Sequence, residues 1–112
     1  MYKNIFTIIM TLAILFGLLL VPAPVQAGTT CYPTGYTRDY IDLTAAYINP
    51  TSLTGVVDAT GCNIGVYFDH NYVGTAELLN VDIYGANYFG VLVNGDAGDV
   101  EVNIKNSRIH DI

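Results

Sequence analysis

Two short segments of this chain are nearly identical although they lie 25 residues apart. "GVYFD" occupies residues 65–69 and "GVLVN" occupies residues 90–94. A shift of 26 aligns later apolar positions, such as Ile83 with Ile109, and the extra residue falls in the loop "GDAGDVE", where insertions are tolerated. A repeat of this length indicates structural units that stack on one another, because a single unit cannot bury its apolar face alone.

Apolar and polar residues alternate within each unit. Residues 64–68 and 89–93 both have the period of two that is typical of short β-strands. Turn sequences such as "DATG" and "NGDAG" separate the strands, and no amphipathic helix fits between them. Each unit therefore predicts one coil of short strands, and each strand is expected to pair in parallel with its counterpart in the next coil. The expected stacked pairs are Ile64 with Phe89, Val66 with Val91 and Phe68 with Val93, all facing inward, and Asn80 with Asn106 in an amide ladder.

The sequence "NVDIYGANYFGVLVNG…VEVNIKNSRIHDI" resembles the repeats of secreted right-handed parallel β-helix proteins, the superfamily that includes pectate-lyase-like enzymes. The resemblance covers residues 53–112 and concerns core and turn positions. It implies an all-β fold, a right-handed parallel β-helix (solenoid) with about two coils and the start of a third, and it implies little about activity. A small antiparallel β-sandwich is the alternative that short alternating strands leave open.

The first 27 residues predict a secretory signal peptide. Lys3 precedes an uncharged apolar stretch at residues 5–21, and prolines and small residues follow up to Ala27. This layout is typical of cleavage after Ala27, with an uncleaved membrane anchor as the alternative. We therefore expect a secreted protein, extracellular or at the cell surface, that meets the membrane only through this segment before cleavage.

Residues 28–52 do not join the repeat and are expected to cap the first coil. The stretch at residues 36–50 has both a rough helical spacing and a β-like alternation, so the cap is either helical or extended. In an oxidising compartment Cys31 and Cys62 are expected to form a disulfide, with two buried free thiols as the alternative. The disulfide would fasten the cap to the first coil and contribute about 3–4 kcal/mol.

The third coil is incomplete, and residues 109–112 would leave an apolar core and an unpaired strand exposed. We expect either further coils in a longer chain, of which these residues are the N-terminal portion, or end-to-end self-association.

Charge narrows the range of partners. Without Lys3 the chain has three basic residues against ten acidic ones, a net charge of −7. Such a surface repels phosphate backbones, so nucleic acid is not expected as a partner.

Few residues are candidates for chemistry. Carboxylates on stacked loops suit Ca²⁺, and Asp69, Asp96 and Asp99 are the candidate ligands. The Asn-Thr-Asp, Asp-Asp, Gly-His-Gly and Arg-Ile-Lys motifs of the superfamily's hydrolases do not occur. We assign no catalytic residue and expect no cofactor, and we interpret His70 and His110 as surface residues.

Nine tyrosines make binding the main alternative to catalysis. Aromatic rings on a rigid strand face suit stacking against sugar rings. Tyr67, predicted to face outward, and Tyr72 and Tyr88, in or beside turns, are the candidate residues for binding a polysaccharide. The alternative is that the tyrosines support neighbouring coils.

The sequence thus predicts a secreted, non-catalytic module with a structural or carbohydrate-facing role. The alternative is the N-terminal fragment of a polysaccharide lyase or glycoside hydrolase whose active site lies beyond Ile112.

Overall fold

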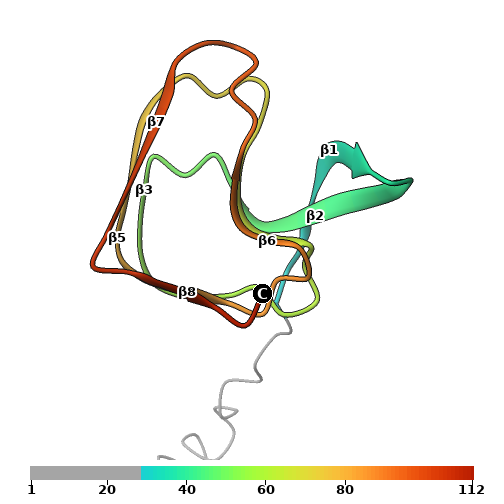
Figure 1. The fold of residues 1–112 in the computed structure, drawn as a ribbon, viewed down its shortest axis with the longest axis horizontal. Helices are drawn as coiled ribbons and strands as arrows, with labels where there is room; N and C mark the ends of the chain where they lie inside the picture. The colour runs from blue at the N-terminus through green and yellow to red at the C-terminus, as the bar shows by residue number, and fades with distance from the viewer. Residues whose placement is uncertain (1–28) are drawn as a thin grey trace, which may run out of the picture.

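The computed structural model describes residues 29–112, and the predicted signal peptide lies outside this range. The described residues form eight β-strands and no helix (Figure 1). The prediction of an all-β chain is therefore confirmed for this part of the protein. The strands are β1 (Tyr32–Arg38), β2 (Ile41–Ile48), β3 (Ser52–Asp58), β4 (Ile64–Phe68), β5 (Gly74–Tyr84), β6 (Phe89–Val93), β7 (Val100–Lys105) and β8 (Arg108–His110).

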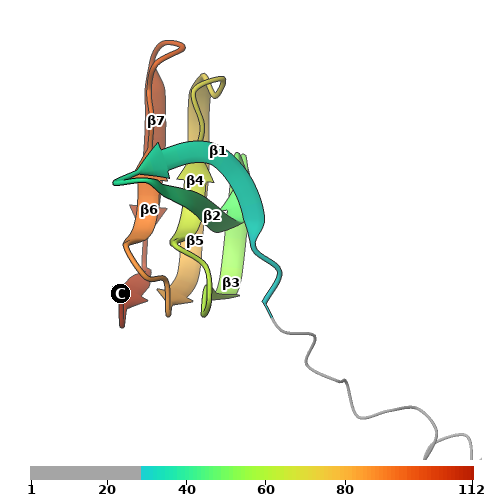
Figure 2. The same ribbon diagram turned by 90° about the vertical axis from the view of Figure 1, so that its right-hand side faces the viewer.

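The strands belong to two four-stranded sheets. The order is β1-β2-β4-β6 in the first sheet and β3-β5-β7 in the second, where β8 also pairs with β5. From β2 to β7 the chain alternates between the sheets, so each circuit returns one strand further along (Figures 1 and 2). The prediction of a single parallel β-helix is wrong, because the strands divide between two sheets and the first sheet is mixed: β1 runs antiparallel to β2.

A tight turn at Asp39 and Tyr40 produces this antiparallel pair. Both residues have a left-handed backbone, with φ of 50° and 64°, and they join Arg38 to its partner Ile41. Two consecutive positive φ angles match the right-handed twist of the flanking strands in a two-residue hairpin. The segment predicted as a cap is thus extended rather than helical, and it forms a β-hairpin at the edge of the first sheet.

The repeated segments lie side by side as predicted. Strand β4 pairs in parallel with β6, with Val66 opposite Val91, and Ile64 and Phe68 also meet their predicted partners. The shift of 26 is equally visible in the second sheet, where Ile83 lies opposite Ile109. The spacing of the repeat in the sequence therefore equals the offset between paired residues of the parallel strands.

The glycine of each repeat makes room for the opposite sheet. A Cβ atom on Gly65 would lie 2.5 Å from the carbonyl oxygen of Gly90 and 2.7 Å from Cγ2 of Ile83. One circuit later, a Cβ atom on Gly90 would overlap Cγ2 of Ile109. Neither glycine has a positive φ, so the requirement is for space. The inner core that these contacts belong to includes Val57, Val66, Phe68, Leu78, Val81 and Ile83.

The hairpin covers the outer face of the first sheet, across β4 and β6 (Figure 2). Leu43 and Ala45 of β2 pack there against Ile64 and Tyr67 of β4, and all four are buried. Ile64 was predicted to face the inner core with Val66, and this is wrong: Ile64 belongs to the outer cluster. Strand β4 is consequently buried on both faces.

Asparagine recurs at the corners for a conformational reason. Asn80, within β5, and Asn106, between β7 and β8, have left-handed φ values of 54° and 49°. Asparagine adopts this conformation more easily than other non-glycine residues. The predicted amide ladder between them is absent from the hydrogen bonds of residues 29–112, and the ladder forms instead between Asn87 Nδ2 and Asn63 Oδ1, at 3.0 Å.

Candidate functional site

Tyr67 is not a surface residue. Its side chain is 2% exposed because the hairpin covers it. The Tyr36 ring of β1 stacks on the Tyr67 ring with centroids 6.0 Å apart, and Asn94 Nδ2 donates a hydrogen bond to the Tyr67 hydroxyl at 3.4 Å. The prediction that Tyr67 faces outward to bind a carbohydrate is therefore wrong, and the residue holds the hairpin to the sheet.

Tyr72 also supports the fold. Its ring makes an edge-to-face contact with Phe68, with centroids 5.0 Å apart. Its hydroxyl donates a hydrogen bond to the carbonyl oxygen of Thr75 at 3.2 Å. The two contacts hold Tyr72, which lies in the loop between β4 and β5, against the end of β4 and the start of β5.

Tyr88 is the one predicted tyrosine that stays half-exposed, at 49%. It lines a hollow of about 340 Å³ beside Arg38 and Asp39, at the tip of the hairpin. The Arg38 guanidinium lies 5.2 Å from the centre of the Phe89 ring, a cation–π contact that fixes the charge at this hollow.

The three predicted calcium ligands do not assemble. Within residues 29–112 no three His, Cys, Asp or Glu side chains gather closely enough to hold a metal ion. Asp69 instead accepts a hydrogen bond from the Asn71 N–H at 2.9 Å, and a hydrogen bond from the Asn49 side chain lowers the pKa of Asp69. Its carboxylate thus stabilises a turn, and the proposed set with Asp96 and Asp99 is not formed.

The predicted disulfide between Cys31 and Cys62 is present, with Cα atoms 5.4 Å apart. Cys62 is fully buried in the inner core, and Cys31 packs against that core. The bond ties the segment that enters β1 to the turn before β4. It therefore links two residues that are 31 positions apart in the sequence and closes a loop that contains β1, β2 and β3.

One titratable cluster was missed by sequence reasoning. His110 Nε2 lies 2.7 Å from Asp82 Oδ1, and His110 Nδ1 lies 2.7 Å from Asp111 Oδ2. Hydrogen bonds to Asp111 and Asp82 raise the pKa of His110, and the ring stacks on Tyr84 with centroids 5.6 Å apart. The alignment at a shift of 26, which places Tyr84 opposite His110, was the signal that could have revealed it.

This cluster favours a charged imidazole. With both ring nitrogens directed at carboxylates, the imidazolium form satisfies both contacts. A ring held in this way has no free nitrogen with which to accept a proton from a substrate. The arrangement is suited to fixing β8 against β5, and we assign it no catalytic role.

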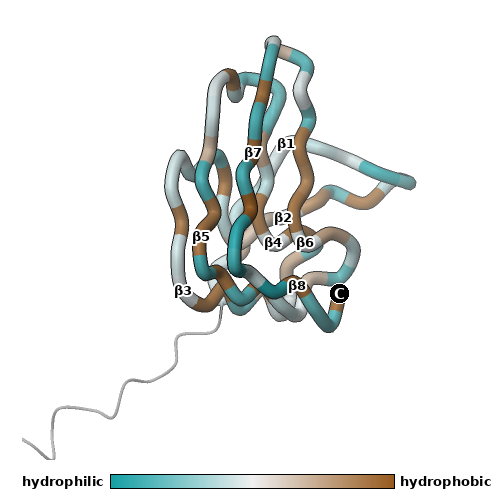
Figure 3. The backbone as a smooth tube through the Cα atoms, turned by 60° about the vertical axis from the view of Figure 1, so that its left-hand side comes forward, coloured by the Kyte–Doolittle hydropathy of each residue, from teal (hydrophilic) through white to brown (hydrophobic). Residues whose placement is uncertain are grey.

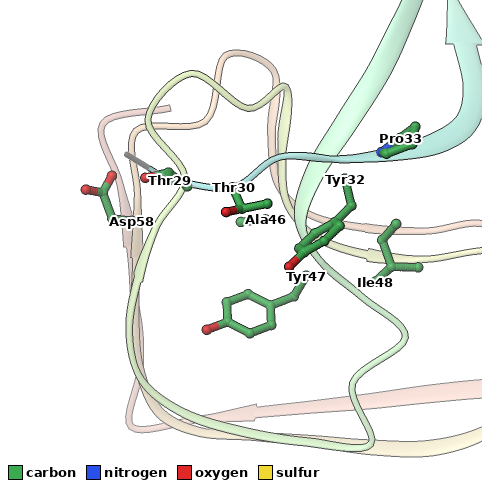
Figure 4. A pocket seen from close by; sticks show the side chains of 8 residues that line it. All are labelled: Thr29, Thr30, Tyr32, Pro33, Ala46, Tyr47, Ile48 and Asp58. Carbon is green, nitrogen blue, oxygen red and sulfur yellow. The ribbon is translucent and has the colours of Figure 1, made fainter. Parts of the chain in front are cut away.

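A larger hollow, which we call the entry hollow, lies where the chain enters the first circuit. Its volume is about 790 Å³, within the range of small-molecule sites. Figure 4 shows the rings of Tyr32, from β1, and Tyr47, from β2, pointing into this space. The exposed fractions are 51% for Tyr32 and 42% for Tyr47. The complete lining is Thr29, Thr30, Tyr32, Pro33, Ala46, Tyr47, Ile48 and Asp58.

The electrostatics of this entry hollow are simple. Among the described residues that line it, Asp58 alone carries a charge. Hydrogen bonds from the side chain and the backbone N–H of Thr60 lower the pKa of Asp58, so its carboxylate is ionised at neutral pH. The hollow thus offers two aromatic faces, hydroxyl groups and one anionic acceptor.

Comparisons with protein-family models, with curated proteins and with solved structures find no match. The resemblance to pectate-lyase-like proteins therefore rests on the sequence pattern alone. Between Thr29 and Ile112 the structure contains no helix of the length and apolarity required to cross a membrane.

Proposed function

We propose that this protein is a secreted, non-catalytic module that binds carbohydrate in the entry hollow. The observation that supports the proposal is the pair of half-exposed tyrosines, Tyr32 and Tyr47, on one open hollow. A tyrosine offers a sugar an apolar ring face and a hydroxyl, and it loses little conformational entropy on binding. The sequence predicted this chemistry, but for other tyrosines.

The framework around the two rings favours a preformed site. Tyr47 of β2 lies opposite Val66 of β4 in the parallel pair of these strands. Tyr32 of β1 lies opposite Ala45 of β2 in the hairpin. The disulfide at Cys31 fixes the residue directly before Tyr32. Because strands and a covalent bond hold both rings, binding requires little rearrangement.

The charge of the lining favours a neutral sugar or an amino sugar. The Asp58 carboxylate repels a uronate and accepts hydrogen bonds from sugar hydroxyl or ammonium groups. The net charge of the whole sequence, −6, acts in the same direction. This preference separates the proposal from the acidic pectin substrates that the family resemblance would suggest.

The proposal is tested by isothermal titration calorimetry with soluble oligosaccharides of glucose, xylose, N-acetylglucosamine, glucosamine and galacturonic acid. We expect binding to a neutral or amino-sugar oligomer, and weakening by roughly tenfold for Tyr32→Ala or Tyr47→Ala, the loss of one stacking contact. Tyr40→Ala is the matched control, because Tyr40 is fully exposed outside the hollow. Melting temperatures verify that each variant is folded.

Two results would contradict the proposal. The first is the absence of binding to any oligomer of the panel at millimolar concentration. The second is binding that is unaffected by Tyr32→Ala and Tyr47→Ala but lost in Tyr88→Ala, which would move the site to the hairpin tip.

A further inference from the structure

Within residues 29–112 the coil has an open end, where its core is exposed, and a covered end, where its core is buried. Val57, Ile83 and Ile109 occupy equivalent positions in successive strands, and their exposed fractions are 1%, 0% and 42%. The same contrast separates Leu78, fully buried, from Ile104, its partner in β7, which is 42% exposed. The core therefore stays uncovered along β7 and β8, and Figure 3 shows brown apolar positions between teal polar ones along β7.

The open end has a regular strand at its edge. Strand β7 pairs with β5 on one side, and on the other side no strand of residues 29–112 pairs with it. Its register with β5 is continuous from Val100 to Lys105. Figure 2 shows β6 and β7 at the same end, with β3 at the opposite end. A long regular edge with apolar flanks is a template for pairing with another strand.

The edges formed by β3 and β1 are less suited to pairing. Strand β3 is also an edge, but its register with β5 shifts between Leu53 and Gly55, and such an irregularity twists an edge away from partners. In the first sheet β1 is an edge as well, and its register with β2 shifts between Pro33 and Thr37. Association of the covered end with the open end of another copy is therefore disfavoured, and contact between two open ends is favoured.

The sequence of β7 is complementary to itself when reversed. The strand reads Val100-Glu101-Val102-Asn103-Ile104-Lys105. Antiparallel pairing centred on Asn103 places each Glu101 opposite Lys105 of the other copy, and each Val102 opposite Ile104. Opposite charges that face each other across strands are stabilising, and like charges are destabilising. Parallel in-register pairing would instead place Glu101 on Glu101 and Lys105 on Lys105.

The distribution of basic residues strengthens this argument. The described residues contain three basic side chains, Arg38, Lys105 and Arg108, and two of them lie at the end of this edge. Acidic Asp99 and Glu101 lie at its beginning. The edge thus has a negative start and a positive end, which attracts an antiparallel copy.

We propose that this protein forms a two-fold symmetric dimer in which β7 of one copy pairs in antiparallel with β7 of a second copy, centred on Asn103. The pairing covers Ile104 and closes the edge, so the assembly stops at two. The entry hollow lies at the opposite end and stays open in both copies. The inference is independent of carbohydrate binding.

The test is sedimentation velocity of the protein purified from its producing cells, together with charge-reversal variants. We expect a dimer for the wild type, and at least tenfold weaker association for Glu101→Lys and for Lys105→Glu, because each creates two like-charge pairs. Mixing the two variants should restore a dimer, since the lysine introduced in one variant then faces the glutamate introduced in the other. The double variant Glu101→Lys/Lys105→Glu should also dimerise.

Three outcomes would overturn the proposal. A wild-type protein that is monomeric at 100 µM, on the order of a weak dimer's dissociation constant, would show that no second copy binds. Monomers whose β7 amides are protected from hydrogen exchange would show that a further segment of the chain covers the edge. Dimers that persist in both single variants would place the interface elsewhere.

Discussion

The substitution Gly90→Ala tests the packing that the repeat encodes. The new methyl group would overlap Cγ2 of Ile109, and the next atoms, Ile109 Cβ and Ile112 Cδ1, lie at 3.7 and 3.8 Å. Overpacking costs about 1–3 kcal/mol. Because Gly90 has no positive φ, alanine also restricts the unfolded chain, which returns about 0.4–1 kcal/mol. The net loss of about 1–2 kcal/mol corresponds to a fall in melting temperature of roughly 5–15 °C.

A double-mutant cycle separates this overlap from a general effect of alanine. Ile109→Leu moves the branch from Cβ to Cγ and removes the Cγ2 atom that the new methyl group meets. We expect Gly90→Ala/Ile109→Leu to recover at least about 1 kcal/mol beyond additivity, measured by urea unfolding followed by circular dichroism. Gly65→Ala is the matched control: its nearest contact is the backbone oxygen of Gly90 at 2.5 Å, so Ile109→Leu should not rescue it. If Gly90→Ala stabilises the protein, or if the cycle shows no coupling, the packing argument is refuted.

Three further predictions concern the covered face, the disulfide and pH. Tyr67→Ala should cost about 3–5 kcal/mol in chemical unfolding, because it empties a buried site beneath the hairpin; a near-neutral result would mean that the hairpin does not cover it. Replacing Cys31 and Cys62 by serine should cost about 3–4 kcal/mol by the same assay, and an unchanged midpoint would contradict a structural disulfide. Hydrogen bonds to its two flanking aspartates raise the pKa of His110 above its ordinary value of 6.5, so its stabilising contribution is complete below about pH 6.5 and is lost as pH rises through the folded-state pKa. An NMR titration of the ring should show the raised pKa, and His110→Gln should remove that part of the pH dependence.

The sequence predicted best what recurs in it. The register of Val66 with Val91 follows from the spacing of the two copies, because stacked units repeat their apolar positions. The repeated glycines and asparagines were visible as well, but their roles were not. The glycines leave space for Ile83 and Ile109, which is apparent only when the opposite sheet is known. The asparagines form left-handed corners, which are apparent only when the backbone angles are known.

The hairpin was the main source of error. Residues 36–50 contain none of the Asn-Gly or Asp-Gly pairs that usually mark a two-residue hairpin turn, and the turn forms at Asp39 and Tyr40 instead. Its packing over β4 is a long-range contact without a local signal. For this reason the alternation rule placed Tyr67 at the surface, and strict alternation also put Ile64 on the wrong face of β4.

The candidate site was missed for the same reason. Tyr47 belongs to a strand that extends the parallel register by one more copy, and Tyr32 belongs to the strand that turns back on it. Once residues 28–52 were interpreted as a cap without a register, neither tyrosine had a predicted neighbour. The chemical expectation of aromatic stacking was retained, but its location depended on the hairpin.

The most direct test of the parallel register is a methyl and amide NOE measurement on isotope-labelled protein in solution. The structure predicts contacts between the side chains of Val66 and Val91. It also predicts interstrand Hα-to-amide contacts between β4 and β6 in which the residue numbers of both strands rise together. Close Hα–Hα contacts between these two strands, which are typical of antiparallel pairing, or the absence of any contact between Val66 and Val91, would contradict the account.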